Sequence, residues 1–316
     1  MNIDLSDEAK EFGRQARRAI EAAGGDQLVQ RAEADPTARA DIAGGVLAEL
    51  GAWDLEPRED ADSAEAAAAL CRSAGYWALP YPLAERLARP EGTDFDGLVV
   101  VASDRPSAAV AGVDARWAAT TVDGHRYGVA GTGTPGPAFT SVLDLRPLDA
   151  GGAADGAADV ALALTLPCWT LLGMLDRAID LTIAHVGMRQ QFGQPLSGFQ
   201  SVQFQLTDAE VERSGLDVLA KYTLWSVSSG RPEAVDDALA LRMAALEAAE
   251  VVFRVCHQLH GAVGFCDETT LSWLSRHSQP LRRLPHGLSA TRELLTTRLD
   301  RHGLTGLFSA EPGAAR

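Results

Sequence analysis

An arginine, glutamines and an aromatic ring are collected in one short stretch of the chain, Arg189-Gln-Gln-Phe-Gly-Gln-Pro195. Arginine offers a planar fork of hydrogen-bond donors that suits a phosphate, and glutamine adds a neutral donor and acceptor. These residue types indicate a site for a phosphorylated ligand. A capped helix end with an exposed arginine would have the same composition, so the residues alone leave both interpretations open.

Two long helices must position this stretch. Apolar residues recur at three- and four-residue steps on both sides of it, which is the spacing of one helix face. Upstream they are Leu171, Leu172, Leu175, Ile179, Ile183 and Val186, and downstream they are Phe199, Val202, Leu206, Leu216, Leu219 and Leu224. Gly193 and Pro195 are turn signals between the two faces. The stretch is therefore predicted to lie at a helix–helix corner.

A second informative stretch, Gln258-Leu-His-Gly-Ala-Val-Gly-Phe265, follows a helix predicted from about Pro232 to His260. The inner face of that helix is predicted from Ala238, Leu241, Ala245, Ala248 and Val252. Gly261 and Gly264 permit backbone conformations and close approaches that a side chain would block. An ordinary glycine cap at the helix end is the alternative interpretation.

Together the two stretches resemble the C-terminal-domain signature of the flavin-dependent acyl-CoA dehydrogenases. The family pattern is Arg-x-Gln-Phe-Gly-x-Pro, then Phe-Gln-x-Val-Gln, and later Gln-x-x-Gly-Gly-x-Gly-Phe/Tyr. The resemblance implies that the arginine contacts the FAD pyrophosphate of a neighbouring subunit and that the second stretch wraps the ADP part. The FAD-contacting residues it implies are Arg189, Gln191, Phe192, Gln200, Gln258, Leu259, His260, Gly261 and Ala262, where Ala262 replaces the family's second glycine.

The resemblance also implies a catalytic glutamate, which the family keeps in one of two places. The first corresponds here to Pro285-His286-Gly287 and the second to Ala161–Pro167, and neither contains a carboxylate. His286 is a weak candidate for the base because imidazole titrates near neutral pH; an exposed loop histidine is the alternative. Asp176 and Asp180 precede Arg189 and are expected to form the polar face of their helix. The family segment Thr-Glu-x-x-x-Gly-Ser, which seats the flavin ring, has no recognisable counterpart.

We expect a mainly α protein with a small β-domain, arranged as in the acyl-CoA dehydrogenases. Residues 1–90 are predicted to be a helical domain, 91–158 a reduced β-domain and 159–316 an antiparallel four-helix bundle that carries the FAD-contacting motifs. Residues 151–158 are expected to be a flexible connection, and Pro167 is expected to open the first bundle helix.

Several local signals support these domains. Leu5, Ala9, Phe12 and Ala16 predict a first helix with Ser6 as its N-cap. Two further helices are predicted at 37–50, ending at Gly51, and at 63–74, ending at Gly75. Short β-branched or apolar runs predict strands at 97–102, 117–122 and 141–145, with a hairpin at Asp123-Gly124.

Composition limits the possible partners and compartment. The 316-residue chain has a formal net charge of −15, which argues against nucleic acid and anionic membranes as partners. No uninterrupted apolar run reaches the ~18–20 residues of a membrane span. The four cysteines are scattered and expected to be reduced. The charged first residues lack an apolar secretory core, so we expect a cytoplasmic protein.

Three functional hypotheses follow. The first is a short subunit of a hetero-oligomeric, FAD-dependent acyl-CoA dehydrogenase, as in bacterial steroid side-chain metabolism. It would lend FAD contacts to a longer partner that carries the catalytic glutamate, in an α2β2 assembly acting on an acyl-CoA. The second is a self-sufficient homodimeric flavoenzyme of secondary metabolism with altered chemistry. The third is a flavin-free structural or regulatory protein on the same fold.

Overall fold

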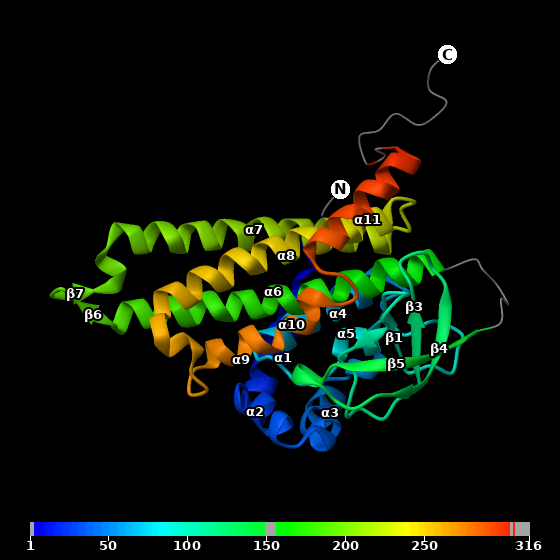
Figure 1. Ribbon diagram of the computed structural model, residues 1–316, viewed down its shortest axis with the longest axis horizontal. Helices are drawn as coiled ribbons and strands as arrows, with labels where there is room; N and C mark the ends of the chain where they lie inside the picture. Colours follow the sequence, from blue (N-terminus) through cyan, green and yellow to red (C-terminus); the bar gives the residue numbers. More distant parts are fainter. Residues whose placement is uncertain (1–2, 149–155, 304–305, 307–316) are drawn as a thin grey trace, which may run out of the picture.

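A computed structural model describes residues 3–148, 156–303 and 306. It confirms the prediction of a mainly helical protein with a small β-sheet, and Figure 1 shows the long helices of the protein lying beside a compact group of shorter helices and strands. The N-terminal helices are α1 (Asp7–Ala23), α2 (Gln27–Ala34), η1 (Pro36–Ala38), α3 (Arg39–Glu49), η2 (Ala52–Asp54), α4 (Ala61–Tyr76) and α5 (Leu83–Leu87).

Local capping chemistry sets several boundaries of these helices. The Ser6 hydroxyl accepts a hydrogen bond from the backbone N–H of Ala9 at 3.2 Å, which confirms the predicted N-cap of α1. Gly51 takes the left-handed conformation after α3, with φ of 68°, as a helix-ending glycine does. Helix α2 was not predicted, because its eight residues bury only Leu28, Val29 and Ala32 and leave a short apolar pattern.

Gly75 does not end α4, as the sequence had suggested, but lies inside it. A Cβ atom at Gly75 would lie 1.9 Å from the carbonyl oxygen of Thr170, and one at Gly173 would lie 1.9 Å from that of Arg72. These two glycines therefore let α4 cross α6 at close backbone distance. The prediction of a stop was wrong because a glycine required by a neighbouring helix has the same local signature as a cap.

The β-domain is one five-stranded sheet with the order β1-β3-β4-β5-β2. Strands β1 and β3 are parallel, and the other pairs are antiparallel. The predicted hairpin joins β3 to β4, with Gly124 at φ of 84°. The strands are β1 (Gly97–Val100), β2 (Ser107–Ala108), β3 (Trp117–Thr120), β4 (Arg126–Thr132) and β5 (Ser141–Pro147), with η3 (Pro137–Phe139) before β5.

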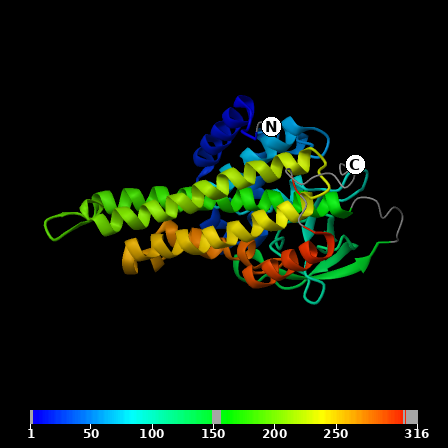
Figure 2. The same ribbon diagram turned by 90° about the horizontal axis from the view of Figure 1, so that it is seen from above.

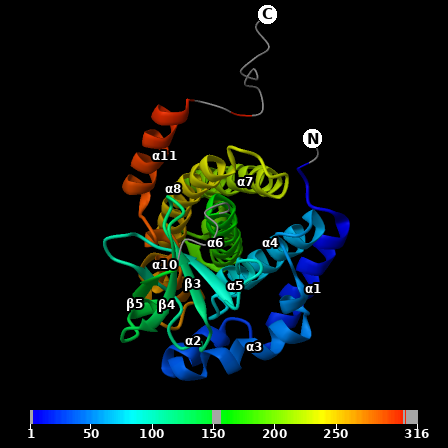
Figure 3. The ribbon, with the colours of Figure 1, turned by 90° about the vertical axis from the view of Figure 1, so that its right-hand side faces the viewer.

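The C-terminal elements form the bundle, with α6 at its centre. Figure 3 looks along the bundle and shows α6 enclosed by α4, α7, α8 and the sheet, while Figure 2 shows α6, α7 and α8 running side by side. The elements are α6 (Gly156–Met188), β6 (Gln190–Gln191), β7 (Gln194–Pro195), η4 (Leu196–Gly198), α7 (Gln200–Ser228), α8 (Ala234–His260), η5 (Gly261–Phe265), α9 (Thr270–His277), α10 (Gln279–Arg283) and α11 (Leu288–His302).

Helix α6 begins earlier than predicted. Most of the expected flexible connection, 151–155, lies outside the described residues, but 156–158 are already helical. Pro167 lies inside α6 rather than at its start, so that prediction was wrong. By length and composition α6 could cross a membrane, yet 83% of its most apolar window is buried inside the protein. It is therefore the core helix of the bundle, and burial on all sides explains why its composition is so apolar.

Candidate functional site

The predicted corner is a tight hairpin at one end of the bundle. Helix α6 ends at Met188, and β6 and β7 then pair across a two-residue turn at Phe192 and Gly193, whose φ angles are 52° and 83°. Two consecutive positive φ angles are typical of a type I′ turn. The backbone N–H of Leu196 donates to the carbonyl of Arg189 at 2.8 Å, which closes the hairpin before α7 begins.

The side chains of this hairpin are presented to solvent. Arg189, Gln191 and Gln200 are exposed, and Phe192 at the tip is 90% exposed. Within the part of the chain that the structure describes, no carboxylate lies within 4.0 Å of the Arg189 guanidinium. A free guanidinium at the base of a rigid turn is available for a phosphate, and its fork can bond two oxygens at once.

The second stretch lies at the end of α8. Gly261 has φ of 64° and ends the helix, and a Cβ atom at Gly264 would lie 2.9 Å from the Cβ of His260. Leu259 and His260 are buried, whereas Gln258 and Ala262 are exposed. The sequence therefore needs glycine at two positions here, one for its backbone conformation and one for its packing.

The fold brings the two stretches to the same end of the bundle (Figure 1). The imidazole rings of His185, one turn before Arg189, and His260 stack with their centroids 4.4 Å apart. Burial lowers the pKa of both histidines, and the charge of Arg189 lowers that of His185 further. Below the stack, Nδ1 of His260 lies 2.9 Å from the carbonyl of Cys256, so that nitrogen carries the proton and donates. Neutral rings can thus pack face to face beside the arginine.

Exposed apolar side chains surround this end. They belong to the last turns of α6, the hairpin, the first turns of α7 and η5, and they are Ile183, Met188, Phe192, Phe204, Val263 and Phe265. Each is at least 52% exposed. Such a concentration of large apolar side chains around polar, exposed motifs is typical of an interaction surface.

The weak base candidate, His286, lies in the loop between α10 and α11. It is half-buried beside the cis peptide Leu284-Pro285, not fully exposed, and burial lowers its pKa. The buried guanidinium of Arg242 donates to the carbonyls of Leu281 at 3.2 Å and His286 at 2.7 Å. This loop is therefore held in place by its backbone, and His286 is one of the residues that line a cleft of about 810 Å³.

The two aspartates on α6 serve helix packing. Arg72 of α4 donates to Asp176 at 2.7 Å, and Arg213 of α7 does so at 3.3 Å. The hydroxyl of Tyr76 donates to Asp180 at 2.9 Å. Both carboxylates thus bind neighbouring helices.

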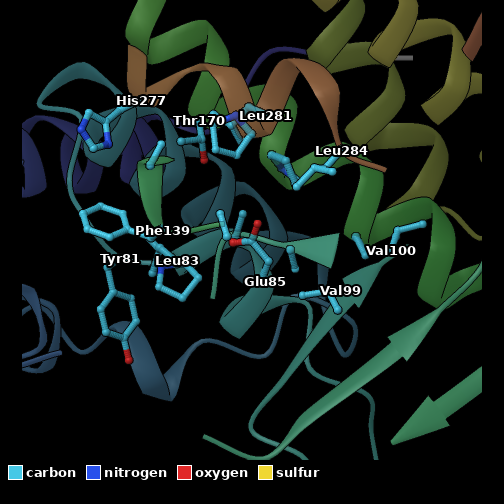
Figure 4. Close-up of a pocket in the computed structure, with 18 of the residues that line it drawn as sticks. Tyr81, Leu83, Glu85, Val99, Val100, Phe139, Thr170, His277, Leu281 and Leu284 are labelled. Carbon is cyan, nitrogen blue, oxygen red and sulfur yellow. The ribbon is translucent and has the colours of Figure 1, made fainter. Parts of the chain in front are cut away.

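Sequence reasoning missed one candidate functional residue, Glu85. The two places where the family's glutamate was expected, 161–167 and 285–287, both contribute residues to one cavity of about 110 Å³ under the sheet. Neither brings a carboxylate to it, but Glu85 of α5 does, and Figure 4 shows its carboxylate pointing into the middle of the cavity. Burial raises the pKa of Glu85. A glutamate in a five-residue helix carries no sequence signal of such a setting.

Comparison with known proteins places these features in context. The family description "Acyl-CoA dehydrogenase, C-terminal domain" matches residues 165–290. Among curated proteins, acyl-CoA dehydrogenase FadE28 of Mycobacterium tuberculosis is 32% identical over 126 residues, which cover 40% of this chain and 37% of that protein. The chain thus spans about a third of the length of the curated relatives that it matches.

Solved structures resemble the chain over nearly its whole length. The ChsE4–ChsE5 complex from Mycobacterium tuberculosis has a TM-score of 0.74 at 16% identity, covering 96% of this chain and 100% of that chain. A variant of the steroid ACAD Tcur3481–Tcur3483 has a TM-score of 0.72 at 20% identity, covering 94% and 99%. At such identities the likeness concerns the fold.

Proposed function

Because residues 165–290 match the C-terminal domain of the acyl-CoA dehydrogenases, we propose that the chain is the FAD-contacting, non-catalytic subunit of a heteromeric acyl-CoA dehydrogenase. One observation carries the proposal. Arg189 and the 258–262 stretch converge on one exposed end of the bundle, where no carboxylate pairs with the arginine among the described residues. In the family the corresponding arginine serves the flavin of a neighbouring subunit.

The residues at this end fit the phosphate-bearing part of FAD. The Arg189 guanidinium would bind the pyrophosphate, and the exposed Gln200 and Gln258 amides would supply neutral hydrogen bonds. When bound, FAD would supply the acceptor for the hydride that leaves the β-carbon of an acyl-CoA. The surrounding apolar side chains would be buried against the partner and would exclude water from these contacts.

The proposed partner is a longer acyl-CoA dehydrogenase chain that carries the catalytic glutamate, in an α2β2 assembly. The absence of a carboxylate from 161–167 and from 285–287 supports this division of labour. Two solved structures with this fold, ChsE4–ChsE5 and Tcur3481–Tcur3483, bear the names of two chains, which supports a pairing of the same kind here.

The stoichiometry of flavin tests this proposal. We expect one FAD per pair of chains, acyl-CoA oxidation by the complex, and a colourless or poorly soluble chain when it is expressed alone. Added FAD should stabilise the complex by mass action and the isolated chain hardly at all. The measurement is flavin absorbance against protein concentration, with and without co-expression of the partner. One FAD per chain, with turnover by this chain alone, would overturn the proposal.

A second candidate function is a self-sufficient flavoenzyme, and Glu85 is the observation that favours it. A carboxyl group with a raised pKa inside a cavity is the kind of group that takes a proton at neutral pH. On this alternative, Glu85→Gln would lower turnover by this chain alone by roughly 10²–10⁴-fold, as loss of a general base does.

A further inference from the structure

The cavity at Glu85 is separate from the end of the bundle that carries Arg189. It lies between α5, β1, the middle of α6 and the segment that contains α10. Thr170 on its wall and Met188 at the end of α6 are about 27 Å apart along the helix axis. Any ligand of this cavity therefore occupies a second site, and the inference drawn from it does not rest on the proposed pairing.

The walls of the cavity are mostly apolar. Figure 4 shows Glu85 in the centre, with Val99 and Val100 of the sheet on one side and Thr170 and Leu284 on the other. The volume of about 110 Å³ approaches that of the ~150 Å³ engineered cavity that binds benzene. A ligand of about six or seven non-hydrogen atoms therefore matches the space.

Glu85 lacks a strong partner in this setting. Among the described residues, no side chain donates a hydrogen bond to its carboxylate or forms an ion pair with it, and the hydrogen bond it receives comes from its own backbone N–H. The side chain is half-buried, and its accessible part faces the cavity. No protein side chain competes for this carboxyl group inside the cavity, so a ligand that bonds to it there gains more than it would at the surface.

The charges around Glu85 decide which ligand chemistry fits. The buried Arg39 lies on the cavity wall, fixed by hydrogen bonds to the carbonyls of Pro80 and Ala111 at 2.7 Å each, and it keeps part of the charge of Glu85 balanced. Arg242 also lines the cavity. A cationic ligand would meet these two guanidinium groups, and an anionic ligand would meet Glu85.

A hydroxyl group is the neutral group that suits a carboxyl group in both of its protonation states. It donates to a carboxylate and accepts from a carboxylic acid. We propose that this cavity binds a small neutral alcohol or phenol, an apolar ring or chain of about six or seven non-hydrogen atoms, with its hydroxyl bonded to Glu85. The apolar part packs against Val99, Met174 and Leu284.

Methionine methyl NMR tests this proposal on the full chain, alone or in the complex proposed above with only this chain labelled. Met174 lines the cavity, whereas Met188 is 76% exposed at the far end of α6 and serves as an internal control. The probe is cyclohexanol, compared with cyclohexylammonium, which has the same size and a positive charge. We expect cyclohexanol to shift the Met174 methyl signal saturably, to leave Met188 unmoved, and to bind more tightly than the ammonium.

Three variants make the test specific to the carboxyl group. Glu85→Leu should weaken cyclohexanol binding about tenfold, because one hydrogen bond is lost, and it should fold because it removes a buried charge. Glu85→Gln, which can still donate and accept, should remain within about threefold of the native chain. Glu49→Gln, at an exposed glutamate of α3, should change nothing.

Each contrary outcome overturns the proposal. An unmoved Met174 signal would mean that no such ligand enters the cavity. Equal binding by Glu85→Leu would mean that the carboxyl group plays no part, and tighter binding of the ammonium would make this a site for cations.

Discussion

Phe192 is one of four non-glycine residues with a positive φ in the described chain, and it lies beside Gly193 at the tip of the hairpin. An aromatic residue in the left-handed region is strained, and such strain persists only where the surrounding structure holds the residue in place, often at functional sites. Here the turn directs the backbone out of α6 and back into α7 within a few residues, which leaves Arg189 at its base with a free guanidinium. On the proposed function, Arg189 is the residue of this end that binds the pyrophosphate.

We predict that Arg189→Ala weakens FAD retention in the assembled complex by about 1.5–3 kcal/mol, because a charge-assisted contact to the pyrophosphate is lost. This corresponds to roughly a 10- to 150-fold higher dissociation constant. Arg189→Lys should recover part of the loss, since it keeps the charge without the fork. Arg18→Ala, at an exposed position on α1, is the matched control. Full flavin occupancy of Arg189→Ala at limiting FAD would contradict the assigned site.

His286 gives the second prediction at this scale. If the catalytic glutamate comes from the partner, His286→Ala should leave turnover of the complex within about a factor of three, whereas removal of a general base costs roughly 10²–10⁴-fold. The loop should survive the substitution because Arg242 bonds to the backbone of residue 286, not to its ring. Steady-state rates of acyl-CoA oxidation measure the effect, and a loss in the larger range would place the chemistry in this chain.

At the scale of elements, the crossing of α4 and α6 holds the N-terminal helices against the bundle. Gly75 and Gly173 lie on facing sides of this crossing, and each has a backbone carbonyl of the other helix where a Cβ atom would be. The ion pair from Arg72 to Asp176 spans the same two helices at 2.7 Å. The crossing also places α5, which follows α4, so that Glu85 lies against the middle of α6.

We predict that Gly173→Ala lowers the free energy of unfolding by about 3 kcal/mol, because the added methyl group forces the two backbones apart. Gly215→Ala in the exposed middle of α7 is the control; nothing lies within 4 Å of its Cβ position, and it should gain up to about 1 kcal/mol from helix propensity. Urea unfolding measures both variants. Equal free energies of unfolding for the Gly173→Ala and Gly215→Ala variants would show that α4 and α6 can move apart without loss of stability.

For the whole molecule, histidines determine how stability responds to mild acid. The pKa of five of the seven is lowered, in each case chiefly by burial, and these are His185, His257, His260, His277 and His286. In the unfolded chain they titrate near pH 6.5, so below that pH the unfolded state takes up protons that the folded state resists. The pKa values of two carboxyl groups, Glu85 and Asp237, are raised, so the folded state takes up these protons more readily than the unfolded state. These two groups therefore add stability as the pH falls.

Because the histidines outnumber those carboxyl groups, we predict that the free energy of unfolding falls as the pH is lowered from about 7 to about 5.5. Unfolding in urea at the two pH values measures the difference. His277→Gln should make the difference in the free energy of unfolding between the two pH values smaller, because His277 is buried and the variant has no imidazole to protonate at this position. A chain that becomes more stable over the same interval would show that the carboxyl groups dominate.

Much of the helical framework could be predicted from the sequence by itself. The periodic apolar faces of α7 and α8, the Ser6 cap, the glycines at 51 and 261 and the hairpin at Asp123-Gly124 depend on neighbours within a few residues. Arg189 and the 258–262 stretch could be recognised for a similar reason, since each is a contiguous motif. That two such motifs share one end follows from antiparallel packing of long helices joined by short turns.

Only the tertiary structure decided the rest. The role of Gly75, the position of Pro167 inside α6 and the setting of Glu85 each depend on a residue far away in the chain. Glycine that ends a helix and glycine that admits a second helix look alike locally, and so do a glutamate in solvent and one that faces a cavity. Close approach, burial and charge balance are properties of several segments at once, and for that reason no single stretch of sequence contains them.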